Sequence, residues 1–160
     1  MTDLFDHRRM RSIGMENSKN NDKTQKFREE RTTALDFVFE RMFRDDTAED
    51  VFSDAETARD TVVSDYVRRV VNGVEEHSSE IDRLIEENLT GWKISRISKM
   101  ALTILRIAVY EMLYEKNIPI SVSINEAVEL AKQYAAEKDS SFINGVLGSI
   151  AKTLDTSGDQ

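Results

Sequence analysis

The stretch ISKMALTILRIAVYEML, residues 97–113, is the most apolar segment of the chain and decides its fold class. Its apolar residues recur at steps of three and four, the spacing that places side chains on one face of an α-helix. These residues are Ile97, Met100, Ala101, Ile104, Leu105, Ala108, Val109, Met112 and Leu113. We therefore expect a central helix that is buried more deeply than any other element.

Helical periodicity continues on both sides of this segment. Upstream it covers residues 27–42, then a valine-rich run at 62–74, then 79–89. Downstream it covers 123–134 and 142–154. The valines favour strands by propensity, but their steps of one and three are those of a half-buried helix. No stretch alternates with period two over a strand's length, so we predict an all-α fold, a compact helical bundle.

Three details of these helices can be predicted from single residues. Ser123 followed by Glu126 has the spacing of a capping box, and we expect it to open the helix there. The acidic, aperiodic stretch 44–56 is predicted to be a loop. Gly145 and Gly148 lie inside the last helix, where glycine costs about 1 kcal/mol relative to alanine. We expect a neighbouring helix to come close at these two positions.

The length of 160 residues suits one domain. Residues 1–22 lack sustained periodicity and are rich in Asn, Ser and Lys, so we predict a disordered leader. The helical domain is expected over residues 23–155, with a disordered tail at 156–160. The longest apolar runs are shorter than the roughly 18 residues that cross a bilayer. Without a secretion signal either, a cytoplasmic location is expected.

Composition argues against enzymatic chemistry. The chain has no cysteine and two histidines, His7 and His77, which are too few for a histidine-based metal site. Arg106 and Glu111 lie in the apolar central helix, where a structural ion pair is a simpler interpretation than proton transfer. We therefore predict no catalytic residue, no metal and no cofactor.

The charge is unevenly distributed along an acidic chain of formal net charge −8. Residues 32–91 carry sixteen acidic and six basic side chains, whereas residues 1–31 carry eight basic and six acidic ones. Within the N-terminal part, four basic residues fall roughly on one side of the first helix: Lys23, Lys26, Arg28 and Arg31. Such an arm can hold phosphates weakly and salt-sensitively, although a solvated polar face has the same composition. An exposed Phe142 could stack a base, and a buried one would belong to the core.

Three motifs in order resemble the NusB transcription antitermination factor family. They are ILRIAVYEM at residues 104–112, SINEAVELAKQYA at 123–135 after Pro119, and FINGVLGSIA at 142–151. Weaker similarity extends over residues 23–154. The resemblance implies two packed helical subdomains and a protein that pairs with ribosomal protein NusE. It also implies that the pair binds boxA RNA in ribosomal RNA leader transcripts and promotes read-through by RNA polymerase within an antitermination complex.

The resemblance also implies which residues bind. The arginine-rich N-terminal region of the family matches Arg28 and Arg31, and a family surface for partner and RNA binding corresponds to residues 139–145. The residues of that surface are Asp139, Phe142, Asn144 and Gly145.

This chain departs from the family pattern in both regions. Glu29 and Glu30 interrupt the basic cluster, and Ser140 and Ser141 stand where basic residues are common. We therefore expect RNA binding by the isolated protein to be weak and NusE to be needed for useful affinity.

Two other interpretations remain open at this point. The chain could be a stand-alone RNA-binding accessory module related to the N-terminal domains of ribosomal RNA cytosine methyltransferases. It could also be a homodimer without an RNA role, since some family members self-associate. Sizing across a concentration series would detect the homodimer.

Overall fold

The computed structural model describes residues 3–59 and 62–158, with side chains over 22–59 and 62–155. These residues form seven α-helices and one short 3-10 helix, η1, and contain no strand. The prediction of an all-α fold is confirmed. The elements are α1 (Asp3–Arg41), α2 (Ala48–Ala58), α3 (Asp65–Glu76), α4 (Ser78–Glu87), η1 (Ile94–Arg96), α5 (Lys99–Tyr114), α6 (Ile120–Tyr134) and α7 (Glu137–Gly158).

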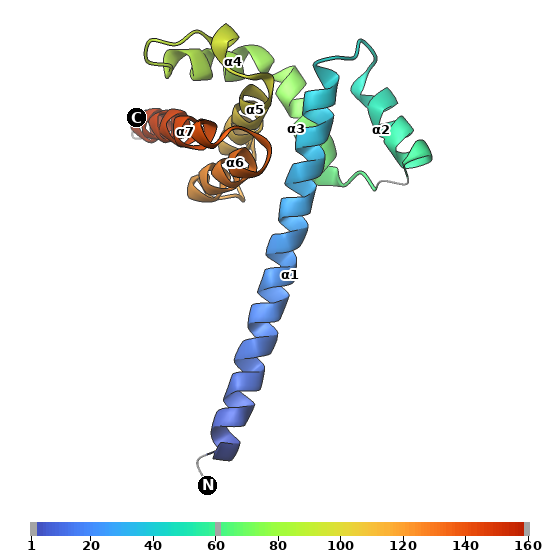
Figure 1. The fold of residues 1–160 in the computed structure, drawn as a ribbon, viewed down its shortest axis with the longest axis vertical. Helices are drawn as coiled ribbons and strands as arrows, with labels where there is room; N and C mark the ends of the chain where they lie inside the picture. Colours follow the sequence, from blue (N-terminus) through green and yellow to red (C-terminus); the bar gives the residue numbers. More distant parts are fainter. Residues whose placement is uncertain (1–2, 60–61, 159–160) are drawn as a thin grey trace.

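Helix α5 is the centre of the bundle. It contacts α1 and α3 in one helical subdomain, and α4, α6 and α7 in the other (Figure 1). Ile104, Leu105 and Val109 of α5 are at most 1% exposed. The expectation of a deeply buried central helix over this segment is therefore confirmed, although α5 begins only at Lys99, with the Ser98 hydroxyl accepting from the Ala101 N–H.

Helix α1 extends back to Asp3, so helical backbone occupies most of the stretch for which we predicted a disordered leader. This N-terminal part projects away from the bundle (Figure 1). A helix without tertiary contacts is marginal in water. Helix α7 covers much of the predicted tail at residues 156–160. The domain boundaries after residue 22 and after residue 155 remain predictions.

Helix α2 corrects the prediction of a loop at residues 44–56. Thr47 and Asp50 form a capping box: the Thr47 hydroxyl accepts from the Asp50 N–H, and the Asp50 carboxylate accepts from the Thr47 N–H. Val51 and Phe52 are fully buried. The steps from Ala48 to Val51, Phe52 and Ala55 are those of a helix, but the acidic residues between them obscured the pattern.

The capping box predicted at Ser123 is wrong. Helix α6 begins at Ile120, directly after Pro119, and Ser123 is a buried residue of its first turn. Its hydroxyl donates to the Glu111 Oε1 at 3.1 Å instead of capping the helix. Proline suits this boundary because its ring fixes φ and it lacks an N–H that would need a partner.

The close approach of two helices occurs at a different glycine from those predicted. A Cβ at Gly145 or Gly148 would meet no atom within 4 Å among the described residues. A Cβ at Gly73, in α3, would overlap the Tyr110 ring in α5, with Cε2 as the nearest atom. Gly73 therefore lets α3 and α5 pack closely, with the Tyr110 ring taking the space of the missing side chain.

Candidate nucleic-acid interface

The basic arm on α1 is partly exposed and partly paired. Lys23 and Lys26 are exposed. The Arg28 side chain is 52% exposed, and its Nε lies 3.3 Å from a carboxylate oxygen of Glu126 in α6. The two lysines are thus the cations of the arm that are most available to an anionic partner.

Arg31 differs from the rest of the arm because it is only 4% exposed. Its guanidinium donates two hydrogen bonds to the carboxylate of Glu111 in α5, from Nε at 3.1 Å and from Nη2 at 2.9 Å. Tyr66 of α3 and Ser123 of α6 also donate to this carboxylate. The Glu111 network therefore joins four helices. Because it is buried in this network, the Arg31 side chain is not accessible to an RNA.

The charges in this network are held by mutual attraction. Burial acts to lower the pKa of Arg31, but the hydrogen bonds and the charge of Glu111 outweigh it, and the pKa is raised. Burial raises the pKa of Tyr66, and the neighbouring Glu111 charge raises it further. Tyr66 thus stays protonated as a donor, which suits a structural role for the network.

Arg106 and Glu111 do not pair with each other as their shared helix suggested. Arg106 binds Asp82 of α4 through two hydrogen bonds of 2.9 Å, whereas Glu111 binds Arg31. Both residues form structural ion pairs, but each partner lies on another helix.

Phe142 is half-buried at the start of α7, where its ring lines a groove of about 450 Å³. The groove lies between the segment before α5 and the beginning of α7. Trp92, 57% exposed, forms the other aromatic wall, with its ring centroid 6.2 Å from that of Phe142. The other lining residues are Arg96, Ile97, Ser98, Ala136, Lys138 and Asp139. Phe142 therefore contributes to the core and to an accessible surface.

The other residues predicted to bind a partner lie on the same helix as Phe142. The Asp139 carboxylate accepts from the Ala136 N–H at 3.1 Å and so caps the start of α7. This helix therefore begins at Glu137, before Asp139 itself. Asn144 and Gly145 are exposed one turn further on. The structure brings Asp139 and Phe142 together in one groove, with Asn144 and Gly145 on the neighbouring surface of α7.

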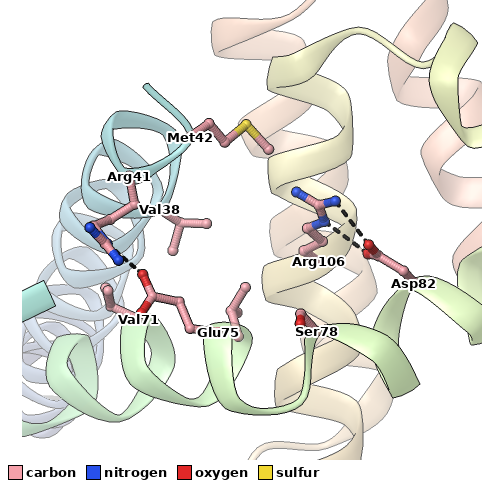
Figure 2. A pocket seen from close by; sticks show the side chains of 9 residues that line it. Val38, Arg41, Met42, Val71, Glu75, Ser78, Asp82 and Arg106 are labelled. Carbon is pink, nitrogen blue, oxygen red and sulfur yellow. Dashed lines mark hydrogen bonds and ion pairs between the residues drawn. The ribbon is translucent and has the colours of Figure 1, made fainter. Parts of the chain in front are cut away.

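A second cavity, of about 330 Å³, lies between the two helical subdomains. Figure 2 shows two arginines on its opposite sides, Arg41 paired with Glu75 and Arg106 paired with Asp82. The Arg41 Nη1 is buried without a hydrogen-bond partner among the described residues. Because a carboxylate neutralises each arginine, this cavity is a weaker phosphate site than a surface with unpaired cations.

Sequence reasoning missed two exposed aromatic residues. Trp92 lies in the connection before η1 and is not among the binding residues predicted from the sequence. Phe43 is 57% exposed just after α1, with the Lys99 ammonium 4.6 Å from its ring centroid. A large aromatic residue beside a helix end was the only available signal in each case.

The described residues contain neither a membrane-spanning helix nor a metal-binding cluster. No helix in that part of the chain is long and apolar enough to cross a membrane. In the same residues, no cluster of three or more His, Cys, Asp or Glu side chains could hold a metal ion.

Comparison with known proteins shows that the chain is similar to one protein family. A model of the NusB family matches residues 28–152. Transcription antitermination protein NusB of Clostridium novyi (strain NT) is 40% identical over 129 residues, covering 78% of this chain and 97% of that protein. The solved structure of T. maritima NusB is 38% identical with a TM-score of 0.70, covering 78% of this chain and 89% of that one. A complex of antitermination factors NusB and NusE with dsRNA contains a chain that is 28% identical, with a TM-score of 0.69, covering 79% of this chain and 96% of that one.

Proposed function

Because the chain belongs to the NusB family and is similar to a transcription antitermination protein of that family, we propose that it pairs with ribosomal protein NusE and that the pair binds boxA RNA. In this proposal the RNA lies in ribosomal RNA leader transcripts, and binding promotes read-through by RNA polymerase. The related chain solved with NusE and dsRNA supports both partners. The protein acts by binding, without a catalytic step.

The observation that carries the proposal is the accessible Phe142 in its groove. Single-stranded RNA is commonly recognised by stacking of bases on aromatic side chains, together with phosphate contacts that hold the strand. Phe142 supplies an aromatic surface, and the exposed Lys23 and Lys26 supply positive charge. The formal net charge of −8 opposes RNA binding by the whole molecule, so NusE is expected to add positive charge and contact area.

Binding of a short boxA-like RNA tests the proposal directly. Fluorescence anisotropy at physiological salt would compare this protein, NusE and the equimolar mixture. Tight binding by the mixture alone is the expected result. Equal affinity of the isolated protein would contradict the need for NusE.

A matched pair of variants tests the surface within the same assay. Phe142→Ala is expected to weaken binding by the mixture, while Lys116→Ala, an exposed change in the turn before α6, leaves it unchanged. Failure of NusE to associate, together with no RNA binding in any mixture, would overturn the proposal.

A further inference from the structure

The groove at Phe142 has a second aromatic wall that is more exposed than the first. Trp92 is the single tryptophan of the chain, and it lies in the connection between α4 and η1. At 57% exposure it leaves much of its indole outside the core, whereas large aromatic side chains are usually highly buried. An exposed tryptophan beside a groove indicates a contact surface.

The rings of Trp92 and Phe142 contact each other at an angle. Their planes are inclined at 54°, with centroids 6.2 Å apart, so the rings form a tilted aromatic contact and do not stack face to face. Together they make one aromatic surface along the groove. The groove volume of about 450 Å³ falls within the range of small-ligand sites. A planar group that enters the groove can stack on the accessible face of one ring while its edge contacts the other.

The charge around the groove favours an anionic occupant. Arg96 and Lys138 line the groove, both exposed and neither paired with a carboxylate in the described part of the chain. Asp139 is the one acidic lining residue, and its carboxylate is engaged by the Ala136 N–H.

We propose that the groove lined by Trp92 and Phe142 receives one unstacked base of single-stranded RNA, stacked on this aromatic surface, with Arg96 and Lys138 holding the adjacent phosphates. Planar apolar walls next to unpaired cations match a nucleotide in both shape and charge. The proposal rests on the RNA-binding function proposed above. It adds a defined base-binding site and three residues, Trp92, Arg96 and Lys138, to that function.

Trp92 itself reports on the proposal, because all tryptophan fluorescence of this chain comes from the groove. A titration with a boxA-like single-stranded RNA, with and without NusE, is expected to quench the emission as binding proceeds. Anisotropy of a labelled copy of the same RNA would measure binding independently. An RNA of equal length with abasic sites keeps the phosphates but lacks the stacking group, and is expected to bind more weakly without quenching. Any tryptophan of NusE would be replaced by phenylalanine for this experiment.

Variants separate stacking from charge. Trp92→Ala is expected to lower RNA affinity by about 5- to 100-fold, while Trp92→Phe, which keeps a ring, retains most of it. Arg96→Ala and Lys138→Ala are expected to weaken binding and flatten its salt dependence. Lys116→Ala is the matched control for loss of one exposed charge, and Phe43→Ala, at the same 57% exposure as Trp92, is the aromatic control in the assay without NusE. Circular dichroism would verify that each variant folds.

The outcomes distinguish this site from the function on which it rests. Quenching by RNA together with the loss in Trp92→Ala supports the site. RNA binding with unchanged tryptophan emission and normal affinity of Trp92→Ala overturns the site and leaves the proposed function standing. A shift of Trp92 emission by NusE alone, followed by no further change with RNA, assigns the groove to the protein partner and overturns it as well. Absence of RNA binding in every mixture overturns both.

Discussion

Arg31 shows how strongly one side chain's environment decides its role. By sequence it belongs to the basic arm, yet its guanidinium lies inside the bundle on Glu111, 80 positions away in the chain. Removing one partner of a buried ion pair leaves an uncompensated charge in a poorly solvated site. The exposed pair between Arg28 and Glu126 lacks this penalty, because water can replace the partner.

Loss of either ion pair is therefore expected to lower the free energy of unfolding by a different amount. Glu111→Ala is expected to lower the free energy of unfolding by about 3–5 kcal/mol, because Arg31 and the Tyr66 hydroxyl lose their partner. Glu126→Ala is expected to cost less than about 1 kcal/mol. Urea unfolding followed by circular dichroism measures both. Equal losses would show that the Glu111 network contributes no more than a surface pair.

Tyr66 predicts a loss of stability at high pH. Its pKa is raised by burial above the ordinary value of 10.0, so above that pH the folded state holds a proton that the unfolded state has released. The free energy of unfolding then falls as pH rises, by up to roughly 1.4 kcal/mol per pH unit from this group. Below pH 10 the contribution is constant. Between pH 8 and pH 11 the free energy of unfolding, measured by urea unfolding at each pH, should fall more steeply for the natural chain than for Tyr66→Phe. Equal slopes for the two proteins would contradict a raised pKa of Tyr66.

At the scale of elements, the contact between α3 and α5 depends on Gly73. Helices pack with interaxial distances set by the side chains between them, and a glycine permits an unusually close approach. The Tyr110 ring, 6% exposed, fills the space beside Gly73 and cannot move easily into solvent. The exposed Gly145 of α7 has open space around it.

Alanine at these two glycines is expected to have opposite effects. Gly73→Ala forces the Tyr110 ring to shift and should lower the free energy of unfolding by about 1–3 kcal/mol. Gly145→Ala meets no neighbour and should raise it by about 0.5–1 kcal/mol through helix propensity. Thermal unfolding of both variants checks this difference in sign. A stabilised Gly73→Ala would mean that the two helices can separate at no cost.

Most helices could be predicted from the sequence, since an apolar stripe follows from the periodicity of the helix itself. The valine-rich pattern at 62–74 correctly indicated α3, although Val62 is 88% exposed and the helix begins at Asp65. Helix starts were less predictable. Ser123 has the side chain of a cap, but its hydroxyl binds Glu111 on another helix, and such a tertiary contact leaves no local signal.

The candidate surface was predictable only where the family motifs reached it. Phe142 was named from its motif, and the structure places it in a groove. Trp92, the opposite wall, lies 50 positions earlier and has no periodic pattern around it. The burial of Arg31 could not be predicted either, because the charge pattern of an arm does not reveal which of its members finds a partner inside the bundle.

At the scale of the whole molecule, the charge distribution predicts how RNA binding responds to salt. Each phosphate contact with a single strand contributes a slope of about −0.7 to the dependence of log affinity on log salt concentration. Lys23→Ala and Lys26→Ala are each expected to flatten the slope of the NusE mixture by about this amount and weaken binding to all sequences alike. Lys116→Ala is the control. Unchanged slopes, measured by anisotropy between 50 and 200 mM salt, would remove the arm from the RNA surface.

The buried position of Arg31 also affects how genetic results on this protein should be interpreted. A screen for loss of antitermination would detect Arg31 substitutions as strongly as those at a true RNA contact, because a chain that fails to fold is degraded. Cellular abundance separates the two cases: it should fall for Arg31→Ala and stay normal for Lys26→Ala. Arg31 and Glu111 are also energetically dependent on each other, since changing either alone leaves the other buried and unpaired. A substitution at one position is therefore expected to be tolerated only together with a compensating change at the other.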